Sequence, residues 1–430
     1  MHRQTSSLQP LLKTDKTIQF ILGLLRANFG TYTTDVFCIS QSLENAEHSC
    51  RELNVDVEKC QEMVLSKRID LYRSLLAPIW KVPSDLLAHI FTFCCPENSF
   101  TRDKLDLPAL HLSQVCAGWR DLSQSTPSLW SSISIHFSST NDTHGEEYRV
   151  FGLLYDYLEL SKDASLFITL AIWDTTQTAM LVLVSLTQHC AQWASFSLVC
   201  ADFPLCILSE ASINGNLPRL VSLRLLWYRL DDVTAIADAF SIAPNLQEVE
   251  IGTSFRFASH LEEPLQIPWA QITKLSHSQR DMAVVLRDLQ IVSNATDVSV
   301  AFINDSHQSN PDSPTHLVHQ LQTLTLIDHG HDYEEHPRWF QKLTLPRLTN
   351  LHFVWMEILS DGQNAADFLD IPVFLERSKC TITVLSLCNM QIEDVKAIEL
   401  LERLPSLVEV KIHEHPSWKR CWMVTPCLLQ

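Results

Sequence analysis

Residues 217–226 read LPRLVSLRLL, and residues 345–354 read LPRLTNLHFV. Both contain an L-x-x-L-x-L pattern, with apolar residues at its first, fourth and sixth positions. With conservative replacements the pattern recurs along the chain at separations of 27, 26, 26, 23, 26, 27, 34 and 25 residues. Its alternating apolar residues predict a short strand in each unit. The first positions are Trp193, Leu220, Leu246, Ile272, Ala295, Leu321, Leu348, Ile382 and Leu407.

Helix-like stretches lie between the predicted strands, at 231–240, 280–289 and 393–404. A strand and a helix repeated every 23 to 34 residues resemble a leucine-rich-repeat solenoid, in which each unit buries its apolar face against the next. The resemblance implies an α/β fold from about 150 to 415, with short parallel strands along one face of a curved solenoid. Regular repeats carry Asn or Cys at the ninth position of the pattern. Here those positions hold Ala201, Tyr228, Ser254, Arg280, Ile303, His329, Met356, Met390 and His415, so the asparagine ladder is missing and we expect an irregular arc.

Two aromatic groups directly follow predicted strands: Trp227 with Tyr228, and Trp355 with Met356. Aromatic residues and methionine are enriched at the centres of protein interfaces. We therefore predict that these four residues bind a protein substrate. Packing in the core is the alternative, and it would bury them.

Two amphipathic helices are predicted in residues 78–130. The sequence Val82-Pro83-Ser84-Asp85 favours a helix start, because proline suits the first helical position and Asp85 in the first turn complements the positive helix N-terminus. One apolar stripe follows at three- and four-residue spacing, with Leu86, Leu87, Ile90 and Phe91. Ser113 is predicted to cap a second helix with Val115, Trp119 and Leu122 on one face. A polar insert, 97–106, separates the two helices.

The order of these residues, ending in Pro127-x-Leu129-Trp130, resembles the F-box of the basidiomycete-fungal class, in which a short coil precedes the box and irregular leucine-rich repeats follow it. The chain departs from that pattern at Val82, Asp85, Trp80-Lys81 and the polar insert. The resemblance implies a three-helix module at 78–135 that binds a Skp-type linker and, through it, a cullin. The residues that it implies for linker binding are Pro83, Leu86, Leu87, Ile90, Phe91, Val115 and Trp119.

The segment before this module is less determined by the sequence. Residues 1–41 carry a weak pattern, with a short helix predicted at 18–26. From Leu43 to Val64 apolar residues alternate at three- and four-residue spacing, which predicts a helix or short coiled coil over 42–77. That helix either packs within its own domain or mediates weak self-association. Residues 416–430 are expected to form a C-terminal tail.

Composition limits the partners. The net charge of −18 argues against a general binder of nucleic acid or anionic membranes. No apolar run approaches the roughly 20 residues that span a bilayer. The thirteen cysteines are scattered through apolar runs, which is typical of reduced thiols in the cytoplasm or nucleus.

The sequence has no Walker, Rossmann, nucleophile-elbow or HExxH motif. Three groups of histidines, around His316, His329 and His413, lack the spacing of a structural zinc site. We therefore expect no catalytic residue, cofactor or metal. The predicted function is substrate recognition for a Skp–cullin–F-box ubiquitin ligase. The alternative is a repeat scaffold for protein interactions that does not associate with a cullin.

Overall fold

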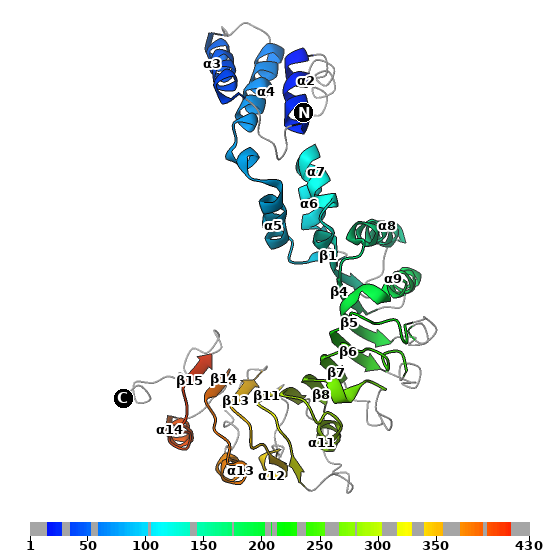
Figure 1. Ribbon diagram of the computed structural model, residues 1–430, viewed down its shortest axis with the longest axis vertical. Helices are drawn as coiled ribbons and strands as arrows, with labels where there is room; N and C mark the ends of the chain where they lie inside the picture. The colour runs from blue at the N-terminus through cyan, green and yellow to red at the C-terminus, as the bar shows by residue number, and fades with distance from the viewer. Residues whose placement is uncertain are drawn as a thin grey trace. The chain divides into compact units, whose positions relative to one another are not determined.

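A computed structural model shows two compact units, 1–134 with 156–164, and 135–155 with 165–430 (Figure 1). Each unit is described separately. The residues that the structure describes are 15–27, 35–52, 59–101, 105–137, 144–173, 176–202, 208, 213–229, 238–253, 266–279, 282–302, 316–328, 339–355, 370–389 and 394–413.

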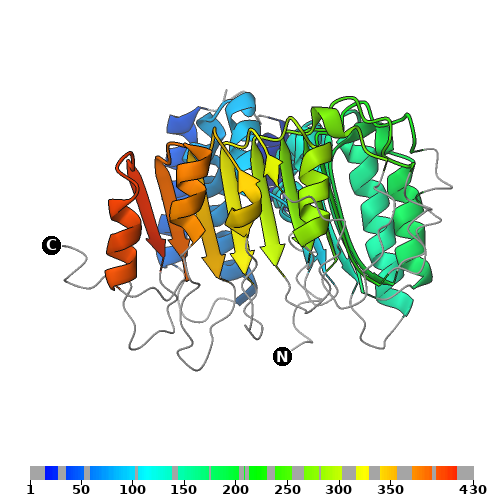
Figure 2. The ribbon, with the colours of Figure 1, turned by 90° about the horizontal axis from the view of Figure 1, so that it is seen from below.

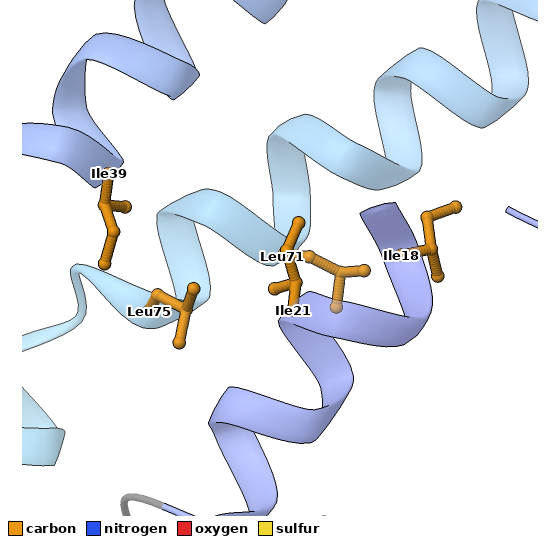
Figure 3. Close-up of a cluster of buried hydrophobic side chains, with 5 residues drawn as sticks. All are labelled: Ile18, Ile21, Ile39, Leu71 and Leu75. Atoms are coloured by element: carbon orange, nitrogen blue, oxygen red, sulfur yellow. The ribbon is translucent and has the colours of Figure 1, made fainter. Parts of the chain in front are cut away.

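The first unit begins with helices α2 (Lys16–Ala27), α3 (Val36–Glu52) and α4 (Lys59–Leu75). The helix predicted at 18–26 is thus confirmed, whereas the single seam predicted from Leu43 is divided between α3 and α4. Because α2 and α3 both pack against α4, these helices bury apolar residues within their own unit. The buried cluster consists of Ile18, Ile21, Ile39, Leu71 and Leu75 (Figure 3).

An aspartate carboxylate caps the start of α2. The Asp15 carboxylate accepts from the N–H groups of Thr17 (2.9 Å) and Ile18 (3.0 Å), as an N-cap does. The other Asp15 oxygen accepts from Arg68 of α4, with Nε at 3.1 Å. Burial opposes ionisation, but the Arg68 hydrogen bond and charge, together with the two N–H groups, hold the pKa of Asp15 below its usual 3.8. The start of α2 is therefore tied to α4 by a charged contact.

The module predicted at 78–135 contains η1 (Pro78–Lys81), α5 (Ser84–Cys94), β1 (Asn98–Thr101), β2 (Leu105–Asp106), α6 (Pro108–Val115), α7 (Ala117–Gln124) and η2 (Pro127–Trp130). The predicted helix is confirmed, but α5 begins at Ser84, so Pro83 is its N-cap residue and not its first helical residue. The prediction that Ser113 caps a helix is wrong, because Ser113 lies buried inside α6. The backbone becomes extended at Cys116 (φ −156°, ψ 172°), and Cys116 Sγ accepts from the Trp119 N–H at 3.3 Å to cap α7.

The predicted polar insert contains a buried asparagine with all its hydrogen-bonding positions filled. The Asn98 amide donates to the carbonyls of Leu129 (2.8 Å) and Ser132 (3.1 Å). Its Oδ1 accepts from the Ala109 N–H and the Tyr157 hydroxyl, both at 3.3 Å. A primary amide has two donor hydrogens and two acceptor lone pairs, so no polar atom of this buried group lacks a partner. The insert is therefore a structural link between β1, α6 and η2.

The second unit is built on a large parallel sheet, whose order is β15-β14-β13-β11-β9-β8-β7-β6-β5-β4 (Figure 2). Neighbouring strands pair in parallel along this whole order. Helices lie along one face of the sheet (Figure 1). The strands are β4 (Leu166–Ile172), β5 (Trp193–Asp202), β6 (Ser222–Arg229), β7 (Glu248–Thr253), β8 (Lys274–Gln279), β9 (Asp297–Phe302), β11 (Thr323–Asp328), β13 (Asn350–Trp355), β14 (Val384–Cys388) and β15 (Glu409–His413).

Strand β3 (Ser132–Phe137) and helix α8 (His144–Ser161) are divided between the two units. The remaining elements of the second unit are α9 (Gln177–Thr187), η3 (Cys190–Gln192), η5 (Trp269–Gln271), α11 (Met282–Ile291), α12 (Trp339–Lys342), α13 (Asp370–Ser378) and α14 (Asp394–Glu402). A separate parallel pair joins β10 (Leu317–Val318) to β12 (Leu343–Thr344). Helices α11 and α14 confirm the stretches predicted at 280–289 and 393–404. Of the helix predicted at 231–240, residues 231–237 lie outside the described residues and 238–240 form a turn.

Backbone hydrogen bonds fix the register from one strand to the next. The Gln247 carbonyl accepts from the N–H groups of both Thr273 and Lys274, at 2.9 and 3.1 Å. Because one carbonyl binds two successive N–H groups of the next repeat of the pattern, each strand begins beside the previous one. The same arrangement occurs at the carbonyls of Val221, Thr273, Thr296, Gln322, Thr349 and Thr383.

Side-chain hydrogen bonds between successive repeats of the pattern occur at two positions, neither of which is the ninth position where regular repeats carry asparagine. Just before the strand, a threonine hydroxyl donates to the carbonyl of the previous unit, as Thr349 does to Gln322 at 3.1 Å. Just before the first apolar position, an amide does the same, as Asn245 does to Pro218 at 2.6 Å. The other members are Thr273, Thr296 and Thr383 in the first group, and Gln271 and Asn294 in the second.

Candidate interaction surfaces

Helix α5 has one buried and one exposed apolar side. Leu87 and Phe91 are four residues apart, and each is only 1% exposed. Leu86, Ile90 and Phe93 follow the i, i+4, i+7 spacing and are 55%, 45% and 74% exposed. A stripe of three large apolar side chains therefore faces solvent along this helix, and we call it the α5 stripe.

The buried side of α5 packs within the first unit. The rings of Phe91 and Trp119 lie 4.8 Å apart between α5 and α7, with Trp119 half-buried. Leu87 and Phe91 are therefore core residues, and the prediction that they contact a linker directly is corrected. Residues adjacent in sequence lie about 100° apart on a helix, so Leu87 and Phe91 turn toward the core while Leu86 and Ile90 turn toward solvent.

Other predicted linker residues do lie at the surface. Pro83, at the start of α5, is exposed, and Val115, at the end of α6, is 60% exposed. The sequence prediction missed Phe93, whose ring makes an edge contact with His89 at 4.8 Å. The spacing of seven residues from Leu86 is the signal that could have revealed it.

The second candidate surface is the sheet face opposite the helices of the second unit. Side chains alternate along each strand, so the third, fifth and seventh positions of each repeat of the L-x-x-L-x-L pattern point to this face. The fifth positions form a mostly small and polar row across the sheet, whereas the seventh positions are mostly apolar. The fifth-position row is Ser197, Arg224, Glu250, Ser276, Ser299, Thr325, His352, Ser386 and Lys411.

Charges on this face are paired across neighbouring strands. Arg224 of β6 contacts Glu250 of β7 at 2.9 Å, and Lys274 of β8 lies 3.9 Å from Glu248 of β7. Near β13, burial and the charge of Lys411 lower the pKa of His352, which Asp297 and Glu409 oppose. The lowered pKa favours the neutral form of the His352 imidazole, which can donate one hydrogen bond and accept one.

Trp227 does not belong to this face. It lies inside β6 and is 3% exposed. The strand continues past the sixth position of its unit, so Trp227, at the eighth position, shares the buried face with Leu223 and Leu225. The prediction that Trp227 binds a substrate is thus corrected to core packing.

The other predicted substrate residues cannot be placed on a face. Tyr228 lies in β6 and Trp355 in β13, but their side chains are outside the described residues. Met356 lies wholly outside them.

A buried histidine was also missed. His277 occupies the sixth position of its unit, where most other units carry an aliphatic residue, and it is 3% exposed. Its Nδ1 lies 3.5 Å from an Asp288 carboxylate oxygen, which joins β8 to α11. The histidine at 316 and its neighbour His319 are likewise structural. His316 contacts the Thr344 hydroxyl at 2.9 Å, and His319 contacts the Val292 carbonyl at 3.0 Å.

The described residues offer little for metal binding or thiol chemistry. Among the residues that the structure describes, no group of three His, Cys, Asp or Glu side chains is arranged to hold a metal ion. The described cysteines are all free thiols, and burial raises the pKa of Cys95 to about 11. Within the same parts of the chain, no helix combines the length and apolar character needed to cross a bilayer.

Comparison with known proteins adds no relative. No family model matches the chain, and no curated protein is detectably similar to it in sequence.

Proposed function

We propose that this protein is a substrate-recognition adaptor of a Skp–cullin–F-box ubiquitin ligase. The order of residues between Pro83 and Trp130 supports the proposal, since it follows that of an F-box. The observation that carries it is the α5 stripe, because Leu86, Ile90 and Phe93 expose large apolar side chains next to the predicted linker-binding position. Exposed apolar residues gathered on one helix are typical of docking surfaces.

The α5 stripe supplies enough apolar surface for a specific contact. Each large apolar side chain contributes about 1.5–3 kcal/mol when it is fully buried, and those of the stripe start about half exposed or more. Three of them would therefore supply about 2–6 kcal/mol before the cost of association is subtracted. Pro83 at the start of α5 and Val115 at the end of α6 are two further exposed apolar residues of the predicted linker-binding set.

In this proposal the second unit holds the substrate, as a leucine-rich-repeat solenoid does. The sheet face opposite the helices offers small hydroxyl side chains, paired charges and His352, whose lowered pKa favours the neutral form. The protein itself performs no covalent chemistry. It raises the effective concentration of substrate lysines near the conjugating enzyme, which makes the transfer step effectively intramolecular.

A repeat scaffold that binds no cullin is the second candidate. It is favoured by one observation, namely that Leu87 and Phe91 are core residues and so are lost from the predicted linker surface. The two candidates differ in whether the α5 stripe binds a linker.

Binding of the full-length protein to a purified Skp-type linker, measured by calorimetry, tests the proposal. Leu86→Asp places a charge in the apolar contact, and we expect at least a tenfold loss of affinity. The matched control is Val373→Asp on α13, since Val373 is a helical residue with 57% exposure and lies in the other unit. Because both substituted residues are exposed, both variants should retain the wild-type unfolding temperature. Linker binding that is equal in both variants and the wild type would exclude the adaptor role of the α5 stripe, and absence of binding by the wild type would favour the scaffold.

A further inference from the structure

The last strand of the parallel sheet has an exposed edge. Among the described residues, β15 pairs with β14 and with no other strand. Val410, at the fourth position of its unit, is 43% exposed, whereas Leu385 at the same position of the preceding unit is fully buried. Val408 beside it is 85% exposed. Natural sheets seldom leave such an apolar edge unprotected.

The backbone of this edge has hydrogen-bonding groups that point away from β14. The Val408 and Glu409 N–H groups both donate to Thr383 O (2.8 and 3.0 Å), and His413 O accepts from the Asn389 N–H (2.7 Å), so from Glu409 onward the odd-numbered residues face β14. Peptide groups alternate in direction along a strand. Val410 and Ile412 therefore present their N–H and C=O groups to the outer edge.

The sequence of this edge is complementary to itself when it is reversed. Residues 408–412 read V-E-V-K-I, so an antiparallel copy centred on Val410 places like-sized or oppositely charged residues opposite each other. Val408 lies opposite Ile412, Glu409 opposite Lys411, and Val410 opposite its own copy. Opposite charges and β-branched pairs are the cross-strand pairs that stabilise antiparallel strands.

Charge also selects this register over the neighbouring ones. A centre at Lys411 would place two lysines opposite each other, and a centre at Glu409 would oppose two glutamates. Like charges directly opposite each other are destabilising. Glu409 and Lys411 are about half exposed and lie 3.2 Å apart within one strand, so both are available for exchange with a second copy.

We propose that two copies of this protein form a homodimer by antiparallel pairing of their β15 strands, centred on Val410. The two Val410 residues exchange a pair of backbone hydrogen bonds. Each Ile412 N–H reaches the Val408 carbonyl of the second copy. Two Glu409–Lys411 ion pairs then lie on the sheet face opposite the helices, one on each side of the two-fold axis. The pairing covers the apolar edge and joins the two sheets.

The mass of the full-length protein, measured by sedimentation equilibrium over a range of concentrations, tests the proposal. The wild type should approach twice the chain mass of 49.0 kDa. Glu409→Lys and Lys411→Glu should each raise the dimer dissociation constant at least tenfold, because each replaces two attractive pairs by two repulsive ones. The double variant Glu409→Lys/Lys411→Glu should restore the dimer, since it reverses both charges.

Two further variants separate this interface from other effects. Val410→Pro removes the outward N–H donor, a change that an edge strand tolerates. The variant should therefore be folded by circular dichroism and monomeric by sedimentation equilibrium. Glu159→Lys makes the same charge change at an exposed site on α8 and should leave the dimer intact. A monomeric wild type would overturn the proposal, whether the edge is covered by the same chain or by an extended segment of another protein. A dimer that persists in Val410→Pro, or that the double variant fails to restore, would also overturn it and point to another surface.

Discussion

Replacement of Asn98 by alanine should destabilise the first unit more than any other single loss of a polar side chain that we propose. The side chain is completely buried and makes four hydrogen bonds, to Leu129, Ser132, Ala109 and Tyr157. Each bond contributes about 0.5–1.5 kcal/mol net, which gives about 2–6 kcal/mol for the four. Carbonyls left buried without a donor add to the cost, so we expect about 4 kcal/mol.

Urea unfolding of the full-length protein provides the assay. Because the two units can unfold separately, the transition of the first unit should be followed by a local probe such as the buried indole of Trp130. Tyr157→Phe removes one of the four bonds together with the hydrogen bond between the Tyr157 hydroxyl and the Leu110 backbone, and should cost about 1–2 kcal/mol. In the second unit, Asn245→Ala removes one exposed hydrogen bond and should change its stability by less than about 1 kcal/mol.

Asn98→Asp tests the direction of the two donor bonds. An aspartate there keeps the acceptor oxygen but faces the Leu129 and Ser132 carbonyls without hydrogens. Burial and these carbonyls should raise the pKa of the new carboxyl in the folded state. The variant should therefore be most stable below the unfolded pKa and should lose stability as the pH rises through the folded pKa. A loss below about 1 kcal/mol in Asn98→Ala, or an Asn98→Asp variant that gains stability with rising pH, would refute the hydrogen-bond assignment.

Three further predictions concern contacts within single units. The folded-state pKa of Asp15 is below its unfolded value of 3.8, so the contribution of Asp15 to stability is present above pH 3.8 and is lost as the pH falls through the folded pKa. Acid unfolding followed by circular dichroism should show this pH dependence in the wild type and a smaller one in Asp15→Asn. Thr349→Val removes one hydroxyl bond between successive strand segments of the second unit and should cost about 0.5–1 kcal/mol in urea, and an unchanged midpoint would show that the bond contributes nothing. His277→Leu should cost about 1–3 kcal/mol because it removes the contact with Asp288. The double variant His277→Leu/Asp288→Leu should recover most of that loss. Additive effects of the two substitutions would show that the pair is not coupled.

The strands of the second unit were predictable because their signal is local. An apolar residue, two intervening residues and an alternating pair define a short strand and the face that it buries. Strand β6 begins two residues after Leu220, and β13 begins two residues after Leu348, as the pattern predicts. Leu220 and Leu348, the first positions of the two patterns, are both fully buried. The helices at 282–291 and 394–402 were predictable for the same reason, since their periodicity is contained in one segment.

The ends of elements were harder to predict, because local preferences compete there. Serine favours a helix cap, yet Ser113 is inside α6, where its hydroxyl donates to the Leu110 carbonyl at 2.7 Å. The cap of α7 is instead Cys116, a residue with a weaker preference for that role. Trp227 was misplaced because the sequence does not say where β6 ends, and two more residues of strand turn it toward the core.

What the sequence determined by itself was the repeated strand pattern, the amphipathic helices and the order of residues that resembles an F-box. Only the tertiary structure decided which side of α5 is buried, because Leu86 and Leu87 are equally apolar and only packing against α7 distinguishes them. The same holds for Asn98, whose partners lie up to 59 residues away, and for the edge of β15, which no other strand of the described residues covers. Periodicity is a property of neighbouring residues, whereas burial depends on which distant segments meet, and a single sequence does not record those meetings.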